Sequence, residues 1–362
     1  MKTAEWLISK AVSTDCPVLL WGEPGTGKTA RLSAFAAEAG FHFFPVVLSH
    51  YDPMELHGIV HVSNDRVRRA MPDGAGPEVF DPAVDSLIFM DELSTSTPSQ
   101  QAAALKIISS ERELGGRKLS PRCRIVAAAN PPESSAGGQE LAPPTANRFV
   151  HVQVTEDVDD FCANFPSLWR GAGSGIELLP APSEDDLARA RALIAAFIKR
   201  RPALLNAKPS DPVAAGGPWP SKRTWELCSR LIAGERDLDR ILAAAAATVG
   251  EAAATELAAF IRECELPDPE AILADPESAP LPERGDILYA AMSAAAAAAI
   301  ARPSRDRVRA VWVYLRRAAE AGHADVAAPV VRPLLQGTGS VFSPVSEPAL
   351  LSPFRRVLDA AK

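Results

Sequence analysis

The first 155 residues alternate short apolar runs with segments whose apolar residues recur at helical spacing. The apolar runs have the length of buried strands and lie at 17–21, 42–48, 87–90, 124–129 and 149–154. Helical spacing is clear at 30–37, and Thr97 followed by Pro98 predicts the start of another helix. This order predicts an α/β domain built on a parallel sheet.

Beyond residue 155 the pattern is helical. The stretch at 155–182 contains Gly and Pro clusters and is typical of a linker. Ser183, with Asp186 three residues later, has the capping-box spacing that starts a helix, and Pro202 follows the end of that helix. Further helices are predicted from 221, over 237–264, near 287–301 and over 304–321.

The turn between the first strand and the next helix is rich in glycine. It matches the pattern G-x-x-x-x-G-K-[ST], known as Walker A, at every position. Its glycines allow a tight turn whose N–H groups face a phosphate, and the helix N-terminus adds partial positive charge. We expect Lys28 to reach the β- and γ-phosphates of a nucleotide and Thr29 to bind Mg²⁺. The predicted nucleotide-binding residues are Gly22, Glu23, Pro24, Gly25, Thr26, Gly27, Lys28, Thr29 and Ala30, together with Asp91.

The apolar run at 87–90 ends in two acids, Asp91 and Glu92. A buried strand brings Asp91 to the C-terminal edge of the sheet, where it can hold Mg²⁺ through water, while Glu92 can polarise an attacking water. An apolar run that ends in two acids is weak evidence alone, but after a complete Walker A motif it indicates Walker B. The run at 124–129 ends in Asn130, whose amide can orient the same water and contact the γ-phosphate.

Composition is ordinary for a soluble globular protein, with 47% hydrophobic and 23% charged residues. The net charge of −7 gives no support for a nucleic-acid or membrane partner. The five cysteines are far apart and include no C-x-x-C pair, which favours reduced thiols in a cytosol over a disulfide or zinc framework. We therefore expect a cytoplasmic protein. The N-terminus lacks a signal-peptide core, and the run at 288–301 is shorter than the roughly 20 residues of a membrane span, so we expect a core helix there.

Three stretches have both a functional and a structural interpretation. The segment 113–119 predicts a hairpin with a Gly-Gly turn, which either presents itself to a substrate or neighbouring subunit or merely connects two elements. Five arginines in 304–321 either bind nucleic acid or an acidic partner or, as we favour, form a solvated helix face. The long irregular stretch 49–82 either holds a metal or, as we favour for want of a clear fourth ligand, exposes three polar histidines: His50, His57 and His61, near Asp52 and Glu55.

The order of these motifs resembles the AAA+ ATPases, and most closely their MoxR-like branch. The likeness covers about residues 1–155 and includes Ala-Ala-Asn130-Pro-Pro and Asn147-Arg148-Phe149. The stretch before Asp91 and the hairpin would match the helix-2 insert and pre-sensor-1 hairpin of that group. Asn147 stands where Asp is more familiar, and we expect little consequence. The Gly-Ala-Phe-Thr-Gly-Ala motif of the transcription-activator branch is absent, which counts against promoter remodelling.

The resemblance implies a role for three further side chains. Asn130 would be sensor 1, and Arg148 would be the arginine finger that completes the site of a neighbouring subunit. Arg223 would be sensor 2, placed over the γ-phosphate at the start of a helix, although Lys222 replaces the proline that usually precedes it. A surface basic pair that caps the helix is the alternative for Lys222 and Arg223. The expected catalytic set is Lys28, Glu92, Asn130, Arg148 and Arg223.

The resemblance also implies an architecture and an activity: a P-loop AAA+ core with a parallel sheet, an all-α lid and a helical C-terminal extension. The expected activity is Mg²⁺-dependent ATP hydrolysis by a homo-oligomeric ring, a hexamer by likeness. It would act on a protein client, with a von Willebrand factor A domain partner. The alternatives are a nucleic-acid motor and a nucleotide-gated scaffold with little turnover. The expected boundaries are 1–158 for the core, 159–182 for the linker, 183–265 for the lid and 266–362 for the extension.

Overall fold

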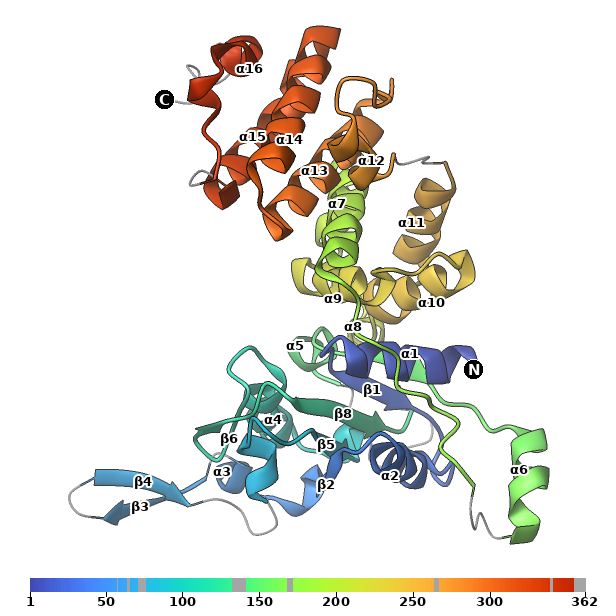
Figure 1. Cartoon of the computed structure of the whole chain (residues 1–362). Coiled ribbons are helices and arrows are strands. Elements are labelled where there is room, and N and C mark those ends of the chain that lie inside the picture. Colours follow the sequence, from blue (N-terminus) through green and yellow to red (C-terminus); the bar gives the residue numbers. More distant parts are fainter. Residues whose placement is uncertain are drawn as a thin grey trace. The chain divides into compact units, whose positions relative to one another are not determined.

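The computed structural model describes most of the chain (Figure 1). The described residues are 1–56, 58–63, 66–70, 76–131, 141–167, 172–263, 267–338 and 341–354. They form two compact units. We call the first the core unit, which comprises Met1–Ala181, Asn206–Leu231 and Ala243–Ala253. The second, the helical unit, comprises Pro182–Leu205, Ile232–Leu242 and Ala254–Lys362.

The core unit is built on a five-stranded parallel sheet with strand order β2-β5-β8-β1-β9. The predicted α/β fold class with a parallel sheet is therefore confirmed. The interior strands are almost wholly apolar, as expected where helices cover both faces of a sheet. The strands are β1 (Val18–Trp21), β2 (His42–Val47), β5 (Ser86–Asp91), β8 (Cys123–Ala129) and β9 (Val150–Gln153).

Three helices of about three turns each pack around this sheet. Helix α1 (Thr3–Ser13) packs on β1 and β9, and α2 (Lys28–Glu38) packs on β2. Helix α4 (Pro98–Ile108) contributes Ala104 and Ile107 to the apolar core around β5 and β8, and it begins with the predicted Thr97 cap. The core therefore fixes the ends of β1, β5 and β8, which carry the candidate site.

The stretch 49–82, predicted to be irregular, contains a β-hairpin. Its strands β3 (Ile59–Ser63) and β4 (Arg66–Ala70) pair antiparallel with each other. The β-branched residues of 59–62 are the signal for a strand, but no apolar alternation in 66–70 marks its partner. The same stretch also contains η1 (Leu48–His50), α3 (Pro53–Leu56) and η2 (Pro77–Phe80).

The hairpin predicted at 113–119 is confirmed. Strands β6 (Glu113–Leu114) and β7 (Arg117–Lys118) pair antiparallel. Both turn residues, Gly115 and Gly116, have positive φ angles of 57° and 77°, which other residues rarely adopt. Leu114 is buried in the core, so the base of the hairpin is held by the sheet domain.

The stretch expected to be a linker contains helix α6 (Val158–Asn164) and η5 (Phe165–Ser167). The segment after it is bonded to the helices of the core unit. The amide of Ser174 donates to Glu38 Oε1 at 2.9 Å, and the Ser9 hydroxyl donates to the carbonyl of Glu177 at 2.5 Å. Residues 172–179 therefore lie fixed along α1 and α2.

The predicted lid, 183–265, is divided between the two units, because contacts of 206–231 and 243–253 are mainly with the core unit. A short helix, α8, lies before the helix predicted from 221, and Gly250 interrupts the helix predicted over 237–264. The elements of 206–263 are α8 (Pro212–Ala215), α9 (Lys222–Ile232), α10 (Leu238–Val249) and α11 (Glu251–Glu263), and the core unit also contains η3 (Leu93–Thr95) and α5 (Pro143–Ala146).

The helical unit has its own apolar core, centred on the fully buried Trp312 and on the alanine-rich helix α13 (Gly285–Ala301). Helix α13 contains the apolar run at 288–301 and is buried as predicted. None of the helices in the described ranges is long and apolar enough to cross a membrane. The elements are α7 (Glu184–Arg200), η6 (Pro202–Leu205), α12 (Pro269–Ala274), α13 (Gly285–Ala301), α14 (Arg305–Ala318), η7 (Ala319–His323), α15 (Ala324–Thr338), η8 (Pro344–Ser346), α16 (Pro348–Leu351) and η9 (Ser352–Phe354).

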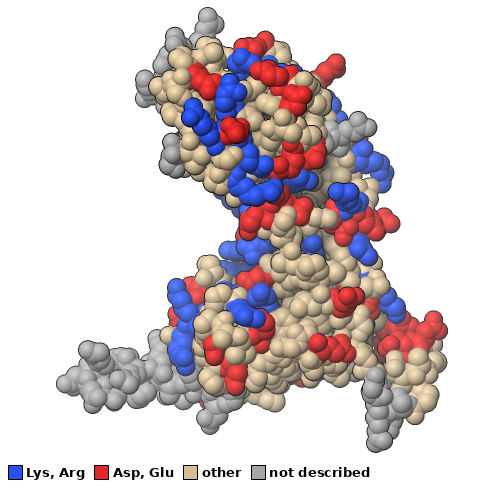
Figure 2. Space-filling view, in the orientation of Figure 1, with Lys and Arg blue, Asp and Glu red and all other residues tan. Residues whose placement is uncertain are grey.

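Several arginines of α14 are paired with acids of the same unit. Arg307 contacts Glu270 at 2.8 Å, and Arg316 contacts Glu277 at 2.9 Å. Figure 2 shows Lys and Arg side chains intermixed with Asp and Glu side chains over this unit. The arrangement fits a solvated, ion-paired helix face.

Candidate nucleotide-binding site

The glycine-rich segment Gly22–Thr29 joins the end of β1 to the start of α2. Gly25 and Gly27 have φ angles of +88° and +73°, so the turn needs residues without a Cβ there. Helix α2 begins at Lys28, and no side chain caps its N-terminus with a hydrogen bond. An uncapped helix N-terminus preceded by such a turn fits an anionic phosphate group.

Lys28 lies inside this turn. Its Nζ donates to the carbonyl oxygens of Gly22 and Glu23 at 2.7 and 2.9 Å and to Oδ1 of Asn130 at 3.2 Å. Burial lowers the pKa of Lys28, and the nearby carboxylates of Asp91 and Glu23 oppose that shift. The ammonium group is thus held by oxygens at the place where a phosphate chain would pass, and it already contacts the predicted sensor residue Asn130.

Two oxygen ligands suited to Mg²⁺ lie side by side next to Lys28. Thr29 Oγ1 donates to Asp91 Oδ2 at 2.7 Å, and Asp91 Oδ1 accepts from the backbone N–H of Glu92 at 2.9 Å. A hydroxyl and a carboxylate at this distance match the two protein contacts that Mg²⁺ typically keeps beside phosphates. The residues present therefore fit the predicted metal, with Thr29 and Asp91 as its holders.

Glu92 has a strained backbone, with a φ of 57° in the left-handed region. Its carbonyl accepts from the N–H of Thr95 at 3.1 Å, and its Oε2 accepts from the hydroxyl of Ser49 at 3.1 Å. The hydroxyl of Ser94 accepts from the N–H of Asn130 at 3.1 Å. Ser49 and Ser94 thus orient the two residues predicted to place water, although no sequence pattern predicts a role for either serine.

Arg148 lies at the opposite edge of the sheet from the glycine-rich turn. It comes two residues before β9, which runs parallel to β1 with Val150 beside Val18. The N–H of Val150 donates to the carbonyl of Pro17 at 2.8 Å, so this is the edge where strands begin. A strand of four residues spans about 13 Å, which separates Arg148 from the end of β1 and the turn after it.

Arg223 lies near Arg148. Burial is the first cause that lowers the pKa of Arg148, and the positive charge of Arg223 is the second. Nη1 of Arg148 donates to the carbonyl of Pro144, whereas its buried Nε has no hydrogen-bond partner among the described residues. The structure thus divides the predicted site residues into two groups. Lys28, Thr29, Asp91, Glu92 and Asn130 lie at one edge of the sheet, and Arg148 and Arg223 lie together away from them.

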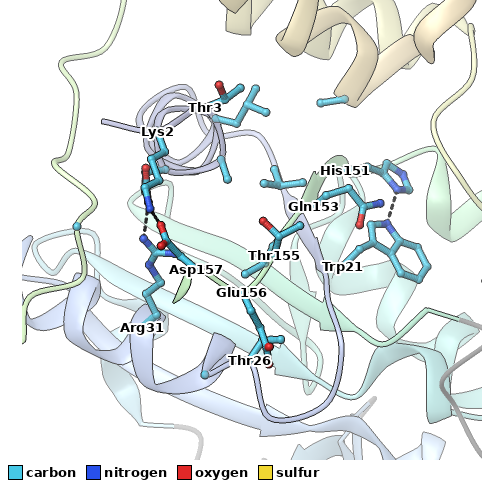
Figure 3. Close-up of a pocket in the computed structure, with 18 of the residues that line it drawn as sticks. Lys2, Thr3, Trp21, Thr26, Arg31, His151, Gln153, Thr155, Glu156 and Asp157 are labelled. Atoms are coloured by element: carbon cyan, nitrogen blue, oxygen red, sulfur yellow. Dashed lines mark hydrogen bonds and ion pairs between the residues drawn. The ribbon is translucent and has the colours of Figure 1, made fainter. Parts of the chain in front are cut away.

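A cavity of about 1940 Å³ adjoins the glycine-rich turn within the core unit (Figure 3). Gly25–Gly27 and Ala30 form part of its wall, as do Trp21, His151 and the start of α1. Gly216–Pro218 and Gly250 line another part of it. Its position beside the phosphate-binding turn suits the nucleoside part of a nucleotide.

The candidate histidine metal site gains no support. The described residues contain no group of three or more His, Cys, Asp or Glu side chains able to hold a metal. His57 and the side chain of His61 lie outside the described part of the structure. His50 is exposed on η1, where Asp52 bonds the backbone N–H of Met54 instead.

The sequence profile of the ATPase family associated with various cellular activities (AAA) matches residues 18–149. Residues 18–149 are thus similar to an AAA ATPase domain. The match runs from β1 to the residue after Arg148, so it includes the turn, the two acids, Asn130 and Arg148. It stops before the cavity wall formed by 213–218 and before Arg223.

Two solved structures show a limited likeness to the chain. A candidate ATPase from Cytophaga hutchinsonii is 17% identical, with a TM-score of 0.39, and the alignment covers 70% of this chain and 78% of that one. A full-length MCM homolog from Methanopyrus kandleri is 17% identical, with a TM-score of 0.35, over 72% of this chain and 53% of that one. The chain thus spans about half the length of the second protein. At this similarity neither structure bears on what the chain does.

Proposed function

We propose that the chain is a Mg²⁺-dependent ATPase of the MoxR-like branch that hydrolyses ATP only when copies assemble into a ring. The observation that carries this proposal is the separation of the site residues into two groups. One edge of the sheet has the side chains that hold a nucleotide and position water. The other has Arg148, whose charge no acid balances among the contacts described here, and it lies too far away to serve the same nucleotide.

The first group has the chemistry for in-line attack of water on a γ-phosphate. Lys28 and the N–H groups of the turn neutralise phosphate oxygens, and Thr29 with Asp91 holds the metal. Bound Mg²⁺ supplies further charge neutralisation at the β- and γ-phosphates. Glu92 accepts a proton from the attacking water, while the side-chain amide of Asn130 orients that water. Ser49 and Ser94 fix these two residues before the reaction, which reduces the cost of orientation.

The second group acts on the nucleotide of the next subunit. Arg148 supplies a guanidinium to the γ-phosphate there, a contribution on the order of 10³–10⁵ in rate. We propose that Arg223 accompanies it, which is supported by the effect of the Arg223 charge on the pKa of Arg148. This differs from the expectation that Arg223 covers the γ-phosphate of its own subunit. A heterologous contact of this kind closes into a ring, for which we adopt the hexamer of the resemblance.

The client and partner of the ring follow from the resemblance to MoxR-like proteins. We propose that hydrolysis moves a protein client, with a von Willebrand factor A domain protein as partner. The presence of Glu92, Asn130 and Arg148 together favours turnover over a scaffold that only binds nucleotide. The ion-paired arginines of α14 give no support to a nucleic-acid motor.

The test is the ATPase rate per subunit as a function of protein concentration, for wild type and Arg148→Ala. We expect a low rate in dilute protein, a steep rise as copies assemble, and a rate at least about 10³-fold lower in the variant. ATP affinity, measured by calorimetry on the same variant, should be unchanged because Lys28 and Thr29 are intact. A rate per subunit that ignores both concentration and Arg148 would contradict the proposal.

A further inference from the structure

Asn147 is a buried polar residue next to Arg148, with only 4% of its surface exposed. Both ends of its side-chain amide are used. Nδ2 donates to the carbonyl of Trp219 at 3.4 Å, and Oδ1 accepts from the hydroxyl of Ser221 at 2.8 Å. These two partners belong to the loop that leads into α9, so Asn147 joins the turn before β9 to that loop.

The loop is closed by a second set of bonds around Thr224. The hydroxyl of Thr224 donates to the carbonyl of Trp219 at 2.8 Å and accepts from the N–H of Ser221 at 2.8 Å. The N–H of Thr224 donates in turn to the hydroxyl of Ser221 at 3.2 Å. Thr224 is 1% exposed. The first turn of α9, which carries Arg223, is therefore tied through this network to the side chain of Asn147.

The hydrogen bonds of Asn147 oppose the electrostatic repulsion between Arg148 and Arg223. Arg148 and Arg223 carry like charges and lie close enough to affect one another. Arg223 is exposed, so its side chain has room to turn away from Arg148. Without an attachment at the start of α9, repulsion between the two cations would favour their separation.

We propose that Asn147 is a positioning residue that holds the start of α9 so that the guanidinium groups of Arg148 and Arg223 meet the same phosphate. The inference rests on the proposed function, in which both arginines serve the neighbouring nucleotide. An amide suits the place because one end must donate to a carbonyl and the other must accept from a hydroxyl. A carboxylate at this position would face the carbonyl of Trp219 with a second acceptor.

The test is a mutant cycle on the ATPase of the full chain at a concentration where wild type is fully active. Asn147→Ala should lower kcat about 100-fold, the size of effect expected when a catalytic group is displaced by about 1 Å. KM for ATP should stay within about twofold, because the residues that bind the subunit's own nucleotide are untouched. Adding Asn147→Ala to Arg223→Ala should lower kcat little beyond Arg223→Ala alone. Ser221→Ala, which removes one bond from the other side, should lower kcat in the same direction but less.

Asn206→Ala, at an exposed asparagine of the core unit, is the matched control and should keep the wild-type kcat. Independent, multiplicative losses from Asn147→Ala and Arg223→Ala would overturn the inference, as would a wild-type kcat in Ser221→Ala and Asn147→Ala. If Asn147→Ala does not fold, Ser221→Ala combined with Arg223→Ala completes the same cycle. If Arg148→Ala abolishes activity while Arg223→Ala does not, the inference fails and the shared site stands. Full activity in Arg148→Ala instead removes the proposed function itself.

Discussion

At the scale of single residues, His151 shows how burial fixes a protonation state beside the cavity. The indole N–H of Trp21 donates to Nδ1 at 2.9 Å, so the proton of the neutral ring is on Nε2, which donates to the carbonyl of Ala146 at 2.9 Å. The dashed line in Figure 3 marks the first of these bonds. Burial lowers the pKa of His151 to about 4. Charging this ring in the folded protein is therefore unfavourable.

This shift predicts a loss of stability in acid. In the unfolded chain His151 binds a proton at a pKa of about 6.5, above its pKa in the folded protein. The free energy of unfolding therefore decreases as pH falls from about 6.5 to about 4. Below that range both states are protonated and the loss stops growing. The full effect is about 3 kcal/mol. Urea unfolding of wild type and His151→Gln across this range should show a steeper fall for wild type. The exposed His50→Gln is the control, and parallel curves for wild type and His151→Gln would contradict the assignment.

How much of the candidate site was predictable depends on how close its residues are in sequence. Lys28 and Thr29 belong to one uninterrupted motif, so the pattern alone named them. Asp91 and Asn130 could be predicted as site residues because each follows a clear apolar run. Ser49 and Ser94 act through contacts that join separate strand ends, and a single serine has no pattern. The place of Arg223 beside Arg148 depends on Asn147 and the loop at 219–224, and no periodicity in the sequence encodes such an attachment.

At the scale of elements, the junction between α10 and α11 is a point of close backbone approach. Gly250 separates these helices, with a φ of +83°, and its N–H donates to the carbonyl of Ala246 at 3.1 Å. A Cβ at this position would lie 2.9 Å from the carbonyl oxygen of Pro218, in the loop that lines the cavity. Neither the angle nor the contact tolerates a side chain without movement of the backbone.

Gly250→Ala should therefore destabilise the core unit by about 1–3 kcal/mol, because it combines left-handed strain with a main-chain clash. Thermal unfolding of the full chain measures the change. Gly217→Ala is the matched control in the same loop, because its Cβ would be 3.5 Å from the carbonyl of Ala214 and its φ is not positive. Equal unfolding temperatures for the two variants would show that the junction relaxes freely.

Sequence pattern predicted most elements but not their grouping into units. The strands of the sheet are short apolar runs and α7 begins at the Ser183 cap, and both signals are local properties of the sequence. The β3–β4 hairpin escaped because 66–70 is rich in arginine and lacks an apolar alternation. The division of the expected lid depends on long-range contacts of 206–231 and 243–253 with the core unit, and these have no local signature.

At the scale of the whole molecule, the central claim is that one catalytic site needs two copies of the chain. The residues that hold nucleotide and water lie where the strands of the sheet end, and Arg148 lies where they begin. A subunit of the proposed ring would therefore present a nucleotide on one side and an arginine on the other. In an assembly, each copy would complete the site of its neighbour, and no copy would complete its own.

Mixing two inactive variants tests this claim most directly. Glu92→Gln lacks the group that activates water but keeps Arg148, whereas Arg148→Ala keeps Glu92. Each alone should fall by at least about 10²-fold in ATPase rate. Dissociated and reassembled as an equal mixture, they should recover about a quarter of the wild-type rate, because a quarter of the interfaces then join an intact Glu92 to an intact Arg148. A mixture no more active than its components would contradict the account and place both residues in a site formed within a single chain.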